Sequence, residues 1–375
     1  MKSEVVNEIN RIGQSIWYDN IERKLLNDGT LSGMVERGEI RGITSNPSIF
    51  NKAISQSDDY DQEIRSLNKD DIHCEEVYEK LAIRDIQEAA DLFSELYEES
   101  GGADGFVSLE VSPYLAHETE KTIQEAIKIW NAVDRPNLMV KIPATLEGLP
   151  AITEVISQGI NVNVTLIFSL DRYRSVREAY LEGLEKRSAA GEDISRVASV
   201  ASFFISRIDT KVDKKLESLE DSSSPEIQRL FGKSAVASGK LAFIDYEQTF
   251  NEGERYMTLK DKGAKRQRVL WASTSTKNPA YPDVIYVEEL IGPETVNTVP
   301  PDTLDKFYDH GKALRTIDQH PEDSKQVFMA LESVGIDMRE VTQELEDEGV
   351  KAFADAFTSL LESLDKKMTE FKTSA

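Results

Sequence analysis

The chain has 375 residues, 39% of them hydrophobic and 30% charged, which is typical of a soluble globular protein with one large domain or two ordinary ones. Its formal net charge of -24 argues against a nucleic-acid partner, because that binding depends on lysine and arginine contacts to phosphates. A single cysteine, Cys74, excludes an intrachain disulfide framework and a multi-cysteine metal site.

The N-terminal segment predicts neither a secretory leader nor a membrane anchor. Its sequence, MKSEVVNEINRIGQ, has the character of a polar helix start and lacks the apolar core of a signal peptide. Elsewhere the chain contains no apolar run of about eighteen residues, the length that a membrane-spanning helix needs. We therefore expect a cytoplasmic protein with no membrane partner.

Eight short runs rich in β-branched and aromatic residues alternate with longer helical stretches. The runs are residues 15–18, 41–44, 106–109, 138–140, 161–164, 197–201, 268–271 and 294–299. Between them lie amphipathic segments such as 118–131 and 170–188, whose apolar residues recur at helical spacing. Strands that alternate with helices in this way predict an α/β fold with a parallel sheet, and eight of them predict a (β/α)8 TIM barrel.

The chain contains no Pro/Gly-rich linker and no charge block that would divide it. We therefore interpret residues 1–375 as a single barrel domain with extra helical segments at 51–104 and 211–264. Residues from about 322 to 375 are expected to form a C-terminal helical extension packed on the barrel. Within this extension, residues 338–371 alternate charged and apolar residues at helical spacing, and a partner-binding helix is the alternative interpretation.

The run LMVKIPAT, residues 138–145, places Lys141 inside an otherwise apolar strand. One interpretation is an edge strand, where a lysine blocks aggregation and extends its amine to water. The other is a buried nucleophile, because burial destabilises the charged amine and leaves a neutral one able to attack a carbonyl and form a Schiff base.

A polar side chain follows almost every predicted strand. In a β/α barrel the carboxyl ends of the strands meet in one mouth, where such enzymes carry their chemistry. Any one of these residues could simply cap a turn or a helix, but their grouping around a lysine favours an active site. The residues are Asp19, Asn46, Glu110, Lys141, Thr165, Ser202, Ser273 and Thr274.

Two motifs resemble the signatures of the transaldolase family: GITSNPSIF at residues 42–50 and LMVKIPAT at 138–145. Residues 162–169, 202–208 and 271–279 follow in the order expected for that family, and the last of these segments resembles the longer bacterial branch. The resemblance implies transfer of a dihydroxyacetone unit between sugar phosphates in the pentose phosphate pathway. It implies no cofactor and no metal. We further expect a monomer or homodimer.

The resemblance also implies roles for individual residues. Lys141 would form the Schiff base, and Asp19 would take the proton of the donor's C4 hydroxyl. Glu110 and Thr165 would manage the water and protons of Schiff-base formation. The residues implied to bind substrate are Asn46, Ser202, Phe204, Arg207, Ser273, Ser275 and Lys277, with the phosphate held by Arg207, by Ser273 or Ser275, and by Lys277.

Some assignments have alternatives. Shorter family members carry an arginine near the position of Lys277, so the second cation contact differs from theirs. Without the neighbouring motif, Arg207 would be interpreted as a surface ion pair with Asp209. Two other functions remain open: a fructose 6-phosphate aldolase, which tends to have Gln at the position of Glu110 and Tyr at that of Phe204, and a non-catalytic barrel that acts as a binding protein.

Overall fold

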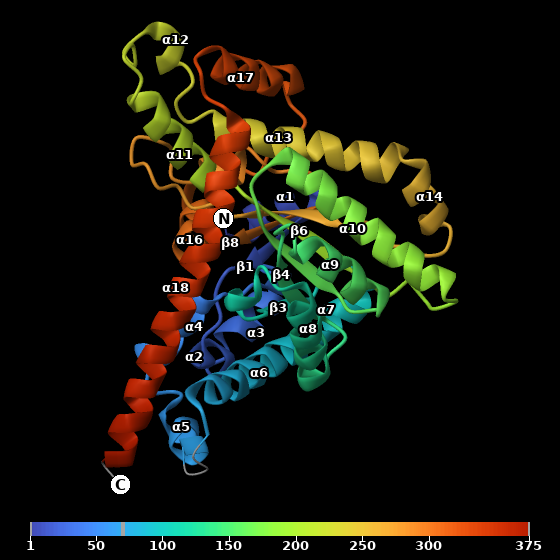
Figure 1. The fold of residues 1–375 in the computed structure, drawn as a ribbon, viewed down its shortest axis with the longest axis vertical. Coiled ribbons are helices and arrows are strands. Elements are labelled where there is room, and N and C mark those ends of the chain that lie inside the picture. Colours follow the sequence, from blue (N-terminus) through green and yellow to red (C-terminus); the bar gives the residue numbers. More distant parts are fainter. Residues whose placement is uncertain (1, 69–71, 374–375) are drawn as a thin grey trace.

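The computed structural model describes residues 2–68 and 72–373, so that residues 69–71 of the predicted segment 51–104, and residues 374–375 of the tail, lie outside the described part (Figure 1). Eight parallel strands form a closed barrel in the order in which they occur along the chain. They are β1 (Gln14–Tyr18), β2 (Gly42–Ile43), β3 (Phe106–Glu110), β4 (Leu138–Pro143), β5 (Val162–Ile167), β6 (Ser199–Phe204), β7 (Arg268–Ala272) and β8 (Thr295–Val299). The predicted TIM barrel is confirmed.

All eight predicted strands are present, but five of them extend past their predicted carboxyl ends: β4, β5 and β6 by three residues each, and β3 and β7 by one. The strands β4, β5 and β6 end at residues 143, 167 and 204, whereas the apolar runs end at 140, 164 and 201. Lys141, Thr165 and Ser202 therefore lie within strands, and Glu110 is the last residue of β3, which corrects the prediction that these four residues follow their strands. The reason is that ladder hydrogen bonds join backbone groups, so a polar side chain that points into the barrel does not end the strand.

Helices surround the barrel, and the predicted helices at 118–131 and 170–188 are present as α8 and α10. The helices before β4 are α1 (Lys2–Ile12), α2 (Arg23–Asn27), α3 (Thr30–Glu36), α4 (Pro47–Ser55), α5 (Asp61–Leu67), α6 (Cys74–Leu92), α7 (Ser94–Glu99), the 3-10 turn η2 (Pro113–Leu115) and α8 (Thr119–Val133). Those after β4 are α9 (Gly148–Ser157), α10 (Leu170–Ala189), α11 (Ser206–Glu217), α12 (Pro225–Gln228), α13 (Ser234–Glu247), the π-helical η3 (Gln248–Glu252), α14 (Glu254–Lys260), α15 (Ile285–Glu288), α16 (Pro301–His310), α17 (Pro321–Ser333) and α18 (Met338–Thr373).

Large aromatic side chains fill the amino-terminal part of the barrel interior. Trp17 of β1 is fully buried, and its ring centroid lies 6.2 Å from that of Phe106 of β3. Between them β2 has Gly42, where a Cβ atom would lie 2.7 Å from the Trp17 ring and 2.8 Å from the Phe106 carbonyl oxygen. The glycine is needed because any side chain there would displace the ring that fills the barrel. The same end also holds a buried polar cluster, in which Asp104 accepts hydrogen bonds from Ser15, Trp17 and Arg41.

The C-terminal helix α18 has 36 residues and runs past the carboxyl ends of the strands, from α11 to α4 and α5 (Figure 1, red). It comes close to β5 at Gly349, where a Cβ atom would lie 3.1 Å from Leu166 Cδ2. Arg172 of α10 donates two hydrogen bonds to the Glu346 carboxylate, at 3.0 and 3.2 Å. A glycine at the closest approach and a charge-assisted pair beside it thus hold α18 against the barrel mouth.

Over the residues that the structure describes, no helix combines the length and the apolar character needed to cross a membrane.

Candidate active site

Lys141 lies in the middle of the barrel wall, on β4 between β3 and β5. It is paired with Glu110 of β3 and with Asn163 of β5 in the strand register. Only 6% of its side chain is exposed, and its Nζ donates a hydrogen bond to the Ser45 carbonyl oxygen at 3.2 Å. A closed barrel has no edge strand, so the interpretation as an aggregation-blocking edge lysine is wrong.

Glu110, the last residue of β3, lies beside this amine. Its Oε2 atom is 3.3 Å from Lys141 Nζ, and 6% of its side chain is exposed. Although the two charges are close, their alignment does not make a hydrogen bond, and Oε2 accepts none from the described residues. Burial raises the pKa of Glu110, while the Lys141 ammonium opposes that shift. A carboxyl group of this kind can hold a proton and donate it next to the amine.

Asp19 follows β1 directly and is held by Val299 at the end of β8 and by Thr44, which follows β2. Its backbone N–H donates to the Val299 carbonyl, and its Oδ1 accepts a hydrogen bond from Thr44 Oγ1 at 2.7 Å. Burial raises the pKa of Asp19, whereas the Thr44 hydrogen bond and the charges of Lys141 and Lys277 lower it. Two carboxyl groups thus face one lysine from different strands, in environments that differ in their hydrogen bonds.

The remaining polar groups of the mouth come from β3, β5 and β6. Thr165 is fully buried, and its Oγ1 has no hydrogen-bond partner within the described residues. Ser202 Oγ donates to Asn163 Oδ1 at 2.7 Å, and Asn163 Nδ2 donates to Ser108 Oγ at 3.0 Å. The orphan hydroxyl of Thr165 is therefore free for a substrate or a water molecule, whereas Ser202 is oriented by Asn163.

Asn163 and Ser108 are residues that the sequence interpretation missed. They precede Thr165 and Glu110 by two positions, and residues two apart on a strand point to the same face. This two-residue periodicity could have indicated from the sequence that Asn163 and Ser108 point into the barrel. Asn46, which was predicted to bind substrate, forms the N-cap of α4, where its side-chain oxygen accepts a hydrogen bond from the Ile49 N–H at 3.1 Å.

A pocket of about 550 Å³ lies beside the mouth, lined by cations of α11 and the β7–α15 loop and by α18. Arg207 lies in the first turn of α11, rather than in a turn before it. Its guanidinium carbon is 5.6 Å from the centre of the Phe204 ring, and the described residues offer it no hydrogen bond or ion pair. The alternative pairing with Asp209 is wrong, because that carboxylate is buried and accepts hydrogen bonds from Ala235 N–H and the Tyr286 hydroxyl.

The other predicted phosphate contacts separate into two pairs. Lys277 Nζ donates to Ser275 Oγ at 2.7 Å on an exposed loop. Ser273 has a backbone φ of +55°, and its hydroxyl shares a hydrogen bond of 3.0 Å with Ser206, the residue before Arg207. Lys277 and Arg207 line the same pocket, so the structure brings the two predicted cations together.

Phe353 of α18 covers the buried amine. The centre of its ring lies 5.3 Å from Lys141 Nζ and 6.5 Å from the Phe204 ring, which in turn lies 5.2 Å from Phe168. The sequence interpretation did not single out Phe353, because an apolar residue on a long amphipathic helix does not reveal which surface it will meet. An aromatic cluster thus forms one wall of the mouth and limits its contact with water.

The fold and the polar cluster at its carboxyl ends define a β/α-barrel enzyme. Residues 16–364 match the family model described as Transaldolase/Fructose-6-phosphate aldolase. The chain is 48% identical over 368 residues to a transaldolase of Trichodesmium erythraeum, covering 96% of this chain and 97% of the relative. It is 47% identical over 367 residues to a transaldolase of Frankia alni, covering 98% of each chain. The chain therefore belongs to the transaldolase family, and its activity is that of a transaldolase, which sets the non-catalytic alternative aside.

Proposed function

We propose that the chain transfers a dihydroxyacetone unit from sedoheptulose 7-phosphate to glyceraldehyde 3-phosphate, giving erythrose 4-phosphate and fructose 6-phosphate, through a Schiff base on Lys141. The observation that carries the proposal is the position of Lys141, buried in the barrel wall with Nζ 3.3 Å from the Glu110 carboxylate. A lysine removed from water is a nucleophile for a ketone, and the neighbouring carboxyl group can exchange the protons that the reaction needs.

Schiff-base formation uses Lys141 and Glu110. Lys141 first passes one proton of its ammonium group to the Glu110 carboxylate, 3.3 Å away. The neutral amine then attacks the ketone carbon, and a proton moves from nitrogen to oxygen to give a carbinolamine. Glu110 then donates a proton to that hydroxyl, the carbon–oxygen bond breaks, water leaves, and the nitrogen lone pair forms the C=N bond. The orphan hydroxyl of Thr165 is available to orient the water molecule that leaves.

Cleavage and transfer use Asp19. Its carboxylate takes the proton of the C4 hydroxyl, the C3–C4 bond breaks, and the electron pair moves into the protonated imine to give an enamine. The first aldose phosphate leaves. The enamine carbon attacks the aldehyde of the acceptor, Asp19 returns its proton to the new alkoxide, and hydrolysis of the imine releases the new ketose phosphate. Every proton taken up is returned, so no cofactor is needed.

Sugar phosphates fit the distribution of charge in the site. In a chain of net charge -24, Arg207 is a locally available cation without a protein partner within the described residues, and Lys277 lines the same pocket. By contrast, Lys211 and Lys215 are engaged by Glu344 and Glu348 of α18 at 2.6 to 3.0 Å. We therefore assign the phosphate to Arg207 and Lys277, with the hydroxyls of Ser273 and Ser275 beside them.

Simple aldol cleavage is the alternative reaction. Phe204 favours transfer, because its ring packs between Phe168 and Phe353 and brings no hydroxyl that would activate water at the enamine. The monomeric or dimeric state and the cytoplasmic location remain predictions from the sequence, as does the interpretation of residues 1–375 as one domain.

A coupled assay that follows consumption of fructose 6-phosphate tests the reaction. We expect consumption to depend on added erythrose 4-phosphate. Borohydride with fructose 6-phosphate should add one reduced dihydroxyacetone unit to the peptide that contains Lys141, and Lys141→Arg should abolish labelling because a guanidinium is not deprotonated. Labelling of another lysine would overturn the assignment, and consumption without an acceptor would favour the aldolase.

A further inference from the structure

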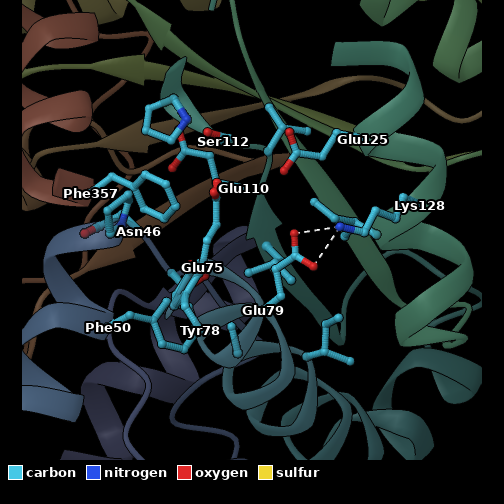
Figure 2. A pocket seen from close by; sticks show the side chains of 18 of the residues that line it. Asn46, Phe50, Glu75, Tyr78, Glu79, Glu110, Ser112, Glu125, Lys128 and Phe357 are labelled. Carbon is cyan, nitrogen blue, oxygen red and sulfur yellow. Dashed lines mark hydrogen bonds and ion pairs between the residues drawn. The ribbon is translucent and has the colours of Figure 1, made fainter. Parts of the chain in front are cut away.

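A small cavity lies beside Glu110 on the side of β3 that faces the helices (Figure 2). Its volume of about 40 Å³ has room for about three or four water molecules, at roughly 10–15 Å³ for each. It shares no lining residue with the pocket around Arg207. Its polar walls come from four places: the segment between β2 and α4, β3 and the following turn, α6, and α8. The polar groups that the argument uses are Glu110, Ser112, Tyr78, Glu79, Glu125 and Lys128.

The inner end of the cavity is the Glu110 carboxylate. Its Oε2 atom is buried, and apart from the Lys141 ammonium 3.3 Å away it has no polar partner among the described residues. A buried carboxylate oxygen without a hydrogen bond is costly in free energy, and the usual partner in a polar cavity of sufficient size is an ordered water molecule. The cavity and the orphan oxygen therefore point to the same ligand, which is water.

Tyr78 of α6 forms another wall of the cavity, beside Phe50 (Figure 2). Its ring lies edge-on between Phe50 and Phe357, with ring centroids 5.7 and 5.4 Å away. Burial raises the pKa of this phenol, and the charges of Glu110, Glu125 and Glu79 raise it further. The hydroxyl therefore stays protonated among three carboxyl groups, so it can both donate and accept hydrogen bonds.

The outer end is formed by Glu125 of α8, opposite the ion pair of Glu79 and Lys128 (Figure 2). The Glu125 carboxylate accepts a hydrogen bond from the Ser112 N–H. Burial raises the pKa of Glu125, the charges of Glu79 and Glu75 act in the same direction, and the Ser112 hydrogen bond and Lys128 oppose them. Lys128 is 58% exposed, so the cavity reaches solvent beside it.

We propose that this cavity holds a short chain of water molecules that connects Glu110 with solvent, and that Glu125 exchanges protons at its outer end. The inference rests on the proposed function, in which Glu110 gives a proton to the carbinolamine hydroxyl and is left as a carboxylate while one water molecule leaves. With substrate in the mouth and Phe353 above Lys141, the front of the site is closed to water. The rear cavity lets the released water depart, and a proton from Glu125 passes along the chain to Glu110.

The test is the rate of Schiff-base formation in the full chain. Borohydride added at set times after fructose 6-phosphate measures the fraction of labelled Lys141. Glu125→Gln should lower that rate by about tenfold, less than the roughly 10²- to 10⁴-fold contribution of a direct general acid. KM for fructose 6-phosphate should be unchanged, the solvent deuterium isotope effect should increase, and formate should restore the rate by supplying protons.

Two further variants complete the experiment. Glu75→Gln alters an exposed rim residue of the same cavity and should match the wild type. Tyr78→Phe keeps the ring between Phe50 and Phe357 and should show the same slow, formate-restored labelling. Wild-type rates and isotope effects in both Glu125→Gln and Tyr78→Phe would overturn the water chain, and so would a loss that formate does not restore. Absence of Lys141 labelling in the wild type would instead overturn the proposed Schiff base.

Discussion

Phe353 of the C-terminal helix lies over Lys141 of the barrel, with the ring centre 5.3 Å from Nζ. More than two hundred residues separate them in the sequence, and α18 brings them together by crossing the barrel mouth. In the proposed mechanism the amine and the later enamine on Lys141 must be kept from water, so that this ring would protect the reaction as well as pack against the barrel.

We expect Phe353→Ala to increase release of free dihydroxyacetone from fructose 6-phosphate without acceptor, and to lower transfer to erythrose 4-phosphate. Phe353→Leu keeps an apolar cover and should stay close to the wild type. The loss of buried apolar surface should cost up to about 3 kcal/mol of unfolding free energy. The measurement is the amount of free dihydroxyacetone and of transfer product formed with and without acceptor. An unchanged ratio of release to transfer would contradict the shielding role of Phe353.

Phe204→Tyr tests the wall of the same site. The added hydroxyl would stand among Phe168, Phe353 and the Arg207 guanidinium, where it can polarise a water molecule next to the enamine. Release of dihydroxyacetone should rise while transfer falls. If Phe204 only packs, both activities should fall together with the melting temperature, and a stable variant with unchanged partition would speak against the hypothesis.

Arg207→Ala should raise KM for phosphorylated substrates far more than for unphosphorylated analogues. A charge-assisted contact is worth on the order of 1.5 to 3 kcal/mol, which corresponds to roughly 10- to 150-fold in kcat/KM. Lys211→Ala is the matched control, since Lys211 lies one turn further along α11 and pairs with Glu344 and Glu348. Steady-state kinetics on both substrate types provides the measurement, and equal losses on the two types would indicate a structural role for Arg207.

Thr44→Val should move the acid limb of the kcat/KM profile to higher pH. Asp19 must be ionised to accept the substrate proton, and the Thr44 hydroxyl stabilises the carboxylate, so its removal raises a pKa that burial has already raised. Activity is lost as the pH falls through that pKa, and the shift should be about one to two pH units. Thr298→Val is the control. It removes the hydroxyl that lies 2.5 Å from Thr44 Oγ1 but keeps the hydrogen bond from Thr44 to Asp19, so the acid limb of the profile should not move. If the acid limb of the kcat/KM profile does not move in Thr44→Val, Asp19 is not the titrating base.

Local patterns were sufficient for much of this protein. The eight apolar runs predicted the eight strands because β-branched residues favour extended backbone and a parallel strand is buried on both faces. Their alternation with helices predicted the barrel, and the position of Lys141 within such a run raised the question of a buried nucleophile. The motifs around residues 42–50 and 138–145 indicated the family that the full-length relatives confirm.

Other features depended on how distant segments meet, which no local pattern contains. Arg207 does not pair with Asp209 because both oxygens of that carboxylate already accept hydrogen bonds, one from the Ala235 N–H and one from the Tyr286 hydroxyl. Which lysines of α11 remain available was decided by the glutamates of α18. The sequence by itself therefore determined the fold class and the family, and it supplied the candidate residues of the site, because those follow from short-range periodicity and residue type. Only the tertiary structure decided which polar groups have hydrogen-bond partners, which are buried and which can still bind a ligand, because hydrogen bonds and burial arise between residues far apart in the chain.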